Sequence, residues 1–256
     1  MFDWWRRLSR AQVLAEPFPE AFRALIAARV PLARQLTAEE RSKLEALVRV
    51  FLSEKQFEGA GGLELSDEMR VVIAARACLL LLHRVETDSA IYPELASIIV
   101  YPSAYRSPQR KREGYVVIEG DEARLGESWQ RGVVVLAWDS VLADGADGHD
   151  VVLHEFAHQL DAEDGVMDGT PELDNAERYS AWSRVAGEEY AELRDAVERH
   201  HRTNIDPYGA SNGPEFFAVV VEAFFEKPVQ LAHQHPELYA ELRLFFRFDP
   251  AARLAQ

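Results

Sequence analysis

The chain has 256 residues, with 28 Lys and Arg against 43 Asp and Glu, and a formal net charge of −15. This acidity argues against direct nucleic-acid binding, which requires a basic surface, and a hydrophobic fraction of 48% excludes a disordered chain. The single cysteine, Cys78, allows no intrachain disulfide. The first residues, MFDWWRRLSR, lack the apolar stretch of a secretory signal, and no apolar run is long enough to cross a bilayer. We therefore expect a cytoplasmic protein without a membrane partner.

The first third of the sequence, residues 17–84, has the pattern of helices. Thr37 and Glu40 form a T-x-x-E capping box that precedes apolar residues at helical spacing. Ser66 is placed to cap a helix over residues 69–83, and the acidic residues that follow it suit the positive end of a helix dipole.

The middle of the chain predicts strands and the remainder predicts helices. Three short runs rich in Val or Ile and bounded by Pro or Gly are expected to be strands: 97–101, 115–119 and 133–138. Helices are expected near 149–162, 172–201, 214–226 and 236–247. This order predicts a helix-rich α+β fold with a small sheet. We expect an N-terminal helical region, 1–90, packed on a catalytic region, 91–256, with one continuous domain as the alternative.

The segment VVLHEFAHQLD contains an H-E-x-x-H motif. On a helix, His154 and His158 lie one turn apart on the same face and can bind one metal ion together. A catalytic zinc site uses three protein ligands and a water, whose pKa the metal lowers to about 7. Glu155 is placed to take a proton from that water and to pass it to the leaving amine. The apolar neighbours of the motif predict a buried helix, on which two histidines need partners.

The sequence leaves the third ligand open. Asp164 occupies the place of the last histidine in H-E-x-x-H-x-x-G-x-x-H, but Asp161 replaces the glycine that would let the chain turn back to the metal. The alternative is a glutamate from the later segment PEFFAVVVEAFFEKP. Its three acidic residues lie on one face of a helix: Glu215, Glu222 and Glu226.

Together these segments carry a family resemblance. HEFAHQLD followed far downstream by PEFFAVVVEAFF resembles the Mlc titration factor A family of bacterial zinc peptidases. The upstream segments IIVYPSAY and GVVVLAW are also similar to that family, so the resemblance extends from residue 20 to residue 248. The catalytic half also resembles the C-terminal protease domain of anthrax lethal factor, which has a similar E-F-F-A helix. Both resemblances imply a zincin-like fold.

The family resemblance also implies roles for individual residues. It makes His154 and His158 zinc ligands, Glu155 the catalytic glutamate and Glu215 the third ligand, which is a gluzincin-like pattern. Tyr208, in IDPYGASNGPEFF, matches a tyrosine near the metal. Glu222 is expected to support the site without binding the metal. From its place directly after the motif, Asp161 is a candidate to orient a histidine.

Two hypotheses for function follow. The first is a peptidase with one Zn²⁺ per chain that hydrolyses a peptide or protein substrate. The second is a regulatory module with a mainly structural zinc. The family name implies sequestration of the transcriptional repressor Mlc, a regulator of glucose uptake. Glu155 favours the enzyme, because a structural zinc site with four protein ligands needs no glutamate beside its first histidine.

Overall fold

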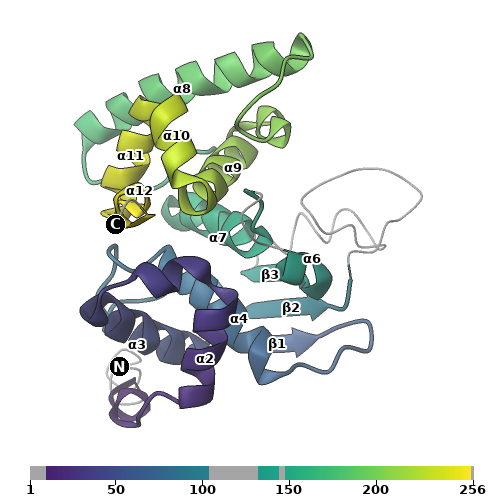
Figure 1. The fold of residues 1–256 in the computed structure, drawn as a ribbon, viewed down its shortest axis with the longest axis vertical. Helices are drawn as coiled ribbons and strands as arrows, with labels where there is room; N and C mark the ends of the chain where they lie inside the picture. Colours follow the sequence, from purple (N-terminus) through teal and green to yellow (C-terminus); the bar gives the residue numbers. More distant parts are fainter. Residues whose placement is uncertain (1–9, 104–131, 144–147, 255–256) are drawn as a thin grey trace. The chain divides into compact units, whose positions relative to one another are not determined.

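The computed structural model describes residues 10–103, 132–143 and 148–254. The chain forms two compact units, Met1–Ala143 and Asp144–Gln256, which are described separately below (Figure 1). The predicted division at residue 90 stays a prediction. In the described ranges, no helix is long and apolar enough to span a bilayer.

The first unit combines helices with a small sheet. Its elements in chain order are α2 (Glu20–Arg29), η1 (Pro31–Gln35), α3 (Ala38–Glu54), β1 (Gln56–Gly59), α4 (Asp67–Leu79), β2 (Ser97–Tyr101), β3 (Val133–Ala137) and α6 (Trp138–Ala143). The predicted capping box is confirmed, because the Thr37 hydroxyl accepts the Glu40 N–H and the Glu40 carboxylate accepts the Thr37 N–H. Ser66 caps α4 as predicted.

Helix α4 ends earlier than the sequence predicts, at Leu79 instead of His83. The chain then tightens into turns in which the N–H of Leu81 bonds to the carbonyl of Cys78 and that of Leu82 to the carbonyl of Leu79. All these residues remain buried. The run of apolar residues therefore continues beyond the end of the helix. It could not indicate where the helix ends, because the turns that follow are as buried as the helix itself.

Three parallel strands form the sheet, in the order β1-β2-β3. The prediction for 97–101 is confirmed by β2, and β3 ends at Ala137, because Trp138 already begins α6. The predicted strand 115–119 lies outside the described residues. Strand β1 was not predicted, because its sequence QFEG contains neither Val nor Ile.

The second unit is helical in its described residues. Its elements are α7 (Val151–Asp161), η2 (Ala162–Asp164), α8 (Ala176–Glu198), η3 (Pro207–Ala210), α9 (Gly213–Glu226), α10 (Pro228–Gln234), α11 (Pro236–Phe246) and α12 (Pro250–Leu254). The four helices predicted for this half correspond to α7, α8, α9 and α11, with ends shifted by a few residues. The helix-rich α+β fold class is confirmed.

Helix α9 is the centre of the second unit. Residues 216–225 are all buried. Phe217 packs edge-on against Trp182 of α8 at 5.7 Å, and Phe224 stacks on Phe246 of α11 at 5.4 Å. Burial of each such aromatic side chain stabilises the fold by roughly 1.5–3 kcal/mol. The other side of α9 packs against α7, so the core fixes these two helices side by side.

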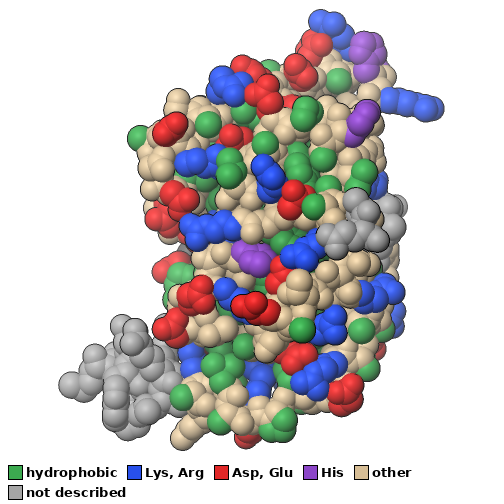
Figure 2. Space-filling model, turned by 60° about the vertical axis from the view of Figure 1, so that its left-hand side comes forward, with side chains coloured by type: hydrophobic (Ala, Val, Ile, Leu, Met, Phe, Trp, Pro, Cys, Tyr) green, Lys and Arg blue, Asp and Glu red, His purple; other side chains and the backbone are tan. Residues whose placement is uncertain are grey.

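Charged side chains cover the surface without dominating the stability. Figure 2 shows Lys and Arg interspersed with Asp and Glu over the face that it draws. Ion pairs such as Arg184 with Glu237 at 2.9 Å are more than half exposed, and pairs of this kind contribute about 0–1 kcal/mol. The stability of the second unit therefore comes mainly from the aromatic core around α9.

Candidate metal centre

The H-E-x-x-H motif lies on α7, a buried helix with a defined start. Asp150 caps it by accepting the N–H groups of Val152 and Leu153 at 2.9 and 3.0 Å. His154 and His158 follow on one face of the helix and are 0% and 1% exposed. Buried imidazoles require polar partners, and the neighbouring helix α9 provides them.

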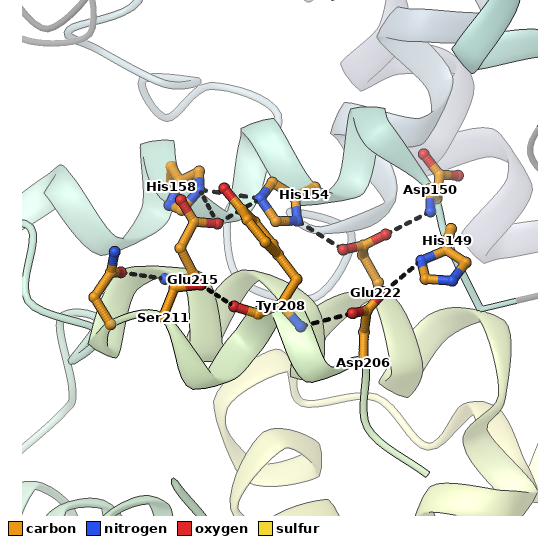
Figure 3. A network of polar contacts seen from close by, with 10 residues as sticks. His149, Asp150, His154, His158, Asp206, Tyr208, Ser211, Glu215 and Glu222 are labelled. Carbon is orange, nitrogen blue, oxygen red and sulfur yellow. Dashed lines mark hydrogen bonds and ion pairs between the residues drawn. The ribbon is translucent and has the colours of Figure 1, made fainter. Parts of the chain in front are cut away.

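Helix α9 begins with a cap that brings a carboxylate to the histidines. The Asn212 side chain accepts the Glu215 N–H at 2.9 Å, and Pro214 occupies the first turn, where its missing N–H costs nothing. Glu215 therefore lies in the first turn of α9, and Figure 3 shows its carboxylate directed at His154 and His158.

Three side-chain atoms converge between the two helices. The Nε2 atoms of His154 and His158 are 3.3 Å apart. Oε2 of Glu215 lies 3.0 Å from Nε2 of His154 and 3.6 Å from Nε2 of His158. Among the residues that the structure describes, these three are the group of His, Cys, Asp and Glu side chains placed to hold a metal ion.

The spacing of the three atoms fits a small tetrahedral cation. Zinc binds nitrogen and oxygen at about 2.0–2.1 Å, which places two ligands of a tetrahedron about 3.3–3.4 Å apart. The three observed separations bracket this value. Two imidazoles and one carboxylate suit zinc and neighbouring transition metals, whereas Ca²⁺ and Mg²⁺ prefer oxygen ligands.

Glu222 connects the first histidine to the start of its own helix. Its Oε1 lies 2.7 Å from Nδ1 of His154, and its Oε2 accepts the N–H of Asp150 at 2.6 Å. Glu222 follows Glu215 by two helical turns and faces α7 like Glu215 (Figure 3). A proton on Nδ1 that is donated to Glu222 leaves Nε2 of neutral His154 available for a metal.

The protonation states of the two histidines and of Glu215 depend on one another. Burial lowers the pKa of His154, but the contacts with Glu215 and Glu222 outweigh it and raise the pKa to about 10. Burial raises the pKa of Glu215, but the two histidines outweigh it and lower the pKa to about 2. Burial lowers the pKa of His158, which keeps that imidazole neutral. A cation that binds here therefore replaces a proton on His154.

Glu155 lies beside His154 on α7 and is only 4% exposed. Burial raises the pKa of Glu155 to about 8, and the neighbouring His154 opposes this shift. A carboxyl group that titrates near neutral pH can both accept a proton and return it. The catalytic role of Glu155 stays a prediction.

Tyr208 lies in the short helix η3, between the predicted helices 172–201 and 214–226. The Asp206 side chain accepts the Tyr208 N–H at 2.7 Å and so fixes the backbone of this turn. The ring centres of Tyr208 and His154 are 6.0 Å apart, and Figure 3 shows the hydroxyl end of Tyr208 directed at the two histidines. The structure brings Tyr208 to the centre, and its catalytic role stays a prediction.

The other candidates from the sequence lie elsewhere. Asp164 is exposed and accepts the Val166 N–H at 2.8 Å, and Glu226 lies at the far end of α9. Both oxygens of buried Asp161 are 2.9 Å from the Gly169 nitrogen, whose N–H they accept. Asp161 therefore holds a loop instead of a histidine, and for His154 the orienting carboxylate is Glu222.

Two features of the centre were not predicted. One is the cap of α7 by Asp150, although an Asp directly before an apolar helical run is a recognisable N-cap signal. The other is the contact between Nδ1 of His149 and Oδ2 of Asp206, 3.2 Å apart, which links the start of α7 to the turn of Tyr208 (Figure 3). No local sequence pattern indicates that second contact.

Comparison with known proteins agrees with this geometry. The profile of the family described as glucose-regulated metallo-peptidase M90 matches residues 2–247. The chain is 44% identical over 254 residues to an uncharacterized protein of Synechocystis sp., covering 97% of this chain and 91% of that protein. It is 29% identical over 259 residues to Mlc titration factor A of Escherichia coli, covering 99% of this chain and 94% of that protein. The same-named protein of Shigella flexneri is 28% identical with the same coverage.

These matches span nearly the whole chain, and the resemblance to the Mlc titration factor A family is confirmed. The zincin-like fold class is confirmed as well, because the histidines of the motif and a distant glutamate meet at one metal-binding position. The chain therefore belongs to the glucose-regulated metallo-peptidase M90 family.

Proposed function

We propose that this chain is a zinc-dependent peptidase in which His154, His158 and Glu215 hold one Zn²⁺ ion. The observation that carries the proposal is the set of three donor atoms, 3.0–3.6 Å apart and fixed between two buried helices. Membership of a metallopeptidase family supports the reaction class. The donor set supports zinc over the hard cations.

The reaction divides between the metal and the side chains around it. When bound, the zinc ion supplies Lewis-acid polarisation of the peptide carbonyl and of the attacking water. Glu155 takes the proton of that water and transfers it to the leaving amine, which keeps the proton count balanced. With a cation held by His154, His158 and Glu215, Glu155 would be favoured in its ionised form, which is the form that accepts a proton.

Two further groups support this chemistry. Tyr208 donates its hydroxyl hydrogen bond to the oxygen of the tetrahedral intermediate, on which negative charge develops. A phenol suits this task because it is a neutral donor at pH 7. Glu222 accepts from Nδ1 of His154 and so holds the imidazole in the orientation that presents Nε2.

Zinc content and peptide cleavage, measured on the same samples, test the proposal. The wild-type chain should hold one Zn²⁺ and cleave members of a peptide library, while His154→Ala and His158→Ala should lose both properties. Glu155→Gln should keep the fold and the zinc and lose activity by about 10²-fold or more. Full zinc in both histidine variants, or full activity of Glu155→Gln, would exclude this assignment.

A second function is suggested by the relatives named Mlc titration factor A. In this alternative the chain binds a transcriptional repressor of sugar uptake, and zinc is mainly structural. We propose a cytoplasmic location, because transcriptional repressors act there; the single cysteine, Cys78, which allows no intrachain disulfide, agrees with a reducing compartment. Purified repressor should then co-elute with Glu155→Gln as well as with wild type, because sequestration needs no catalytic base. If the repressor co-elutes with neither form, the repressor-binding function is excluded and the peptidase function remains.

A further inference from the structure

Gly169 lies in the segment between α7 and α8, and three helices of the second unit contact it. Its N–H is accepted by both oxygens of Asp161, the last residue of α7. Its carbonyl accepts the indole N–H of Trp182 of α8 at 3.2 Å. Its backbone also lies against that of Gly213, the first residue of α9. We call these four residues the Gly169 junction.

The contact between the two glycines leaves no room for side chains. A Cβ on Gly169 would lie 2.4 Å from the carbonyl oxygen of Gly213, and one on Gly213 would lie 2.3 Å from the carbonyl oxygen of Asp168. Gly169 also has a φ of +89°, a conformation that favours glycine. The loop therefore passes directly over the first turn of α9, backbone against backbone.

The junction connects the two places from which the metal donors project. Asp161 follows His158 by three residues on α7, and Gly213 precedes Glu215 by two residues on α9. Trp182, which binds the Gly169 carbonyl, also packs on Phe217 of α9. One short path of contacts thus runs from the end of the histidine helix to the start of the glutamate helix.

We propose that Asp161 is a positioning residue that acts through the Gly169 junction to fix Glu215 opposite His154 and His158. This rests on the proposed function, because it takes Glu215 as a metal ligand. Glu215 lies in the first turn of its helix, where a helix frays most readily, and Gly213 gives that end additional backbone freedom. A metal ligand must be held to within about 0.5 Å, and the junction adds an anchor at this end.

The chemistry of Asp161 agrees with this role. The side chain is 0% exposed, and both of its oxygens accept the backbone N–H of Gly169 in the loop. A carboxylate offers two acceptor oxygens, and both can accept the loop N–H. A neutral amide in the same place would offer one acceptor oxygen, and its NH₂ group would face the N–H as a second donor. Loss of Asp161 releases the loop and with it the support of the first turn of α9.

The test measures Zn²⁺ affinity by competition with a chromophoric chelator, together with the absorption spectrum of the Co²⁺-substituted protein. Asp161→Ala removes the acceptors and Asp161→Asn keeps one of them. Gly213→Ala leaves Asp161 intact, but its added Cβ would lie 2.3 Å from the carbonyl oxygen of Asp168 and so displaces the loop away from α9. Two matched controls change the same chemistry elsewhere: Asp164→Asn, an exposed acid of the same loop, and Gly187→Ala, a glycine of α8 whose added Cβ meets no atom within 4 Å.

We expect Asp161→Ala and Gly213→Ala to weaken Zn²⁺ binding about 10- to 100-fold, as removal of supporting partners typically does, and to change the Co²⁺ spectrum. Asp161→Asn should recover part of the loss, and both controls should match wild type. Circular dichroism verifies that each variant is folded at the temperature of the assay. Should Asp161→Ala not fold, Gly213→Ala and Asp161→Asn carry the same test.

The outcomes separate this proposal from the proposed function. Folded Asp161→Ala and Gly213→Ala with wild-type affinity and an unchanged Co²⁺ spectrum would overturn the positioning role alone. A wild-type chain that binds no Zn²⁺, or a Glu215→Ala variant with undiminished affinity, would overturn the proposed function instead. A loss of affinity in the two variants, with wild-type behaviour in Gly187→Ala, supports the positioning role.

Discussion

Glu222→Gln is a sharp test of the centre, because the substitution keeps the shape of the side chain and changes its hydrogen bonding. Both oxygens of Glu222 act as acceptors, one from Nδ1 of His154 at 2.7 Å and one from the N–H of Asp150 at 2.6 Å. Glutamine has one acceptor oxygen and one donor NH₂ group. One of the two contacts must therefore become donor against donor, in a place where the side chain is 1% exposed.

Each orientation of the glutamine has its own measurable cost. If its NH₂ faces His154, the imidazole places its proton on Nε2, the atom that must bind the metal. Loss of such an orienting partner lowers metal affinity about 10- to 100-fold, which is about 1.4–2.8 kcal/mol. If its NH₂ faces Asp150, a buried N–H loses its acceptor, and the free energy of unfolding falls by about 1–3 kcal/mol.

Two measurements distinguish these orientations: Zn²⁺ affinity by chelator competition, and urea unfolding of the metal-free protein. Glu226→Gln is the matched control, because it makes the same chemical change at the far end of α9. We expect Glu222→Gln to lose affinity, stability or both, and Glu226→Gln to lose neither by a comparable amount. If Glu222→Gln has wild-type affinity and wild-type unfolding free energy, the reasoning from its two contacts is wrong.

Three further predictions concern the donors and the reaction. Tyr208→Phe should keep zinc and KM and lower kcat about 10²–10³-fold; steady-state kinetics with wild-type kcat would remove Tyr208 from the mechanism. Glu215→Ala should lose zinc in elemental analysis while Asp164→Ala retains it; the reverse result would make Asp164 the third ligand. Because the pKa of His154 is raised to about 10 in the metal-free protein, its proton is present at pH 7 and must leave when zinc binds. Affinity should therefore rise about tenfold per pH unit between about pH 6 and 8, and calorimetry in two buffers that detects no released proton would contradict this.

The parts of the centre that could be predicted from sequence are those set by local spacing. His154 and His158 share a helix face because they are four residues apart. The capping box at Thr37 and Glu40 and the N-cap at Ser66 were found because each needs only a few neighbouring residues. Spacing placed Glu215 and Glu222 on one face of α9 but did not decide which of them meets the metal position.

The remaining features depend on how the helices pack. Helix α7 crosses α9 so that Glu215 reaches both Nε2 atoms while Glu222, two turns later, reaches Nδ1 of His154. No residue pattern in the two segments indicates how the two helices are aligned along one another. Asp161 was expected to orient a histidine from its place after the motif. The end of α7 instead directs its carboxylate to the Gly169 N–H, across a loop whose course the sequence does not reveal.

The charge of the centre explains why these residues belong together. Glu155, Glu215 and Glu222 lie close enough to influence one another electrostatically, and the carboxyls of Glu155 and Glu222 are both buried. Burial raises the pKa of Glu222 as well as that of Glu155, because a charged carboxylate loses its hydration in the interior. The proton on His154 offsets one negative charge, whereas a divalent cation at the three donors offsets two and leaves both imidazoles neutral. Three carboxyls surround the two histidines; those of Glu155 and Glu222 are buried and that of Glu215 is half-buried. Such a cluster is a poor structural core but a suitable site for a divalent metal. The cost of these charges in the metal-free protein is the physical reason to expect that metal binding stabilises α7 and α9.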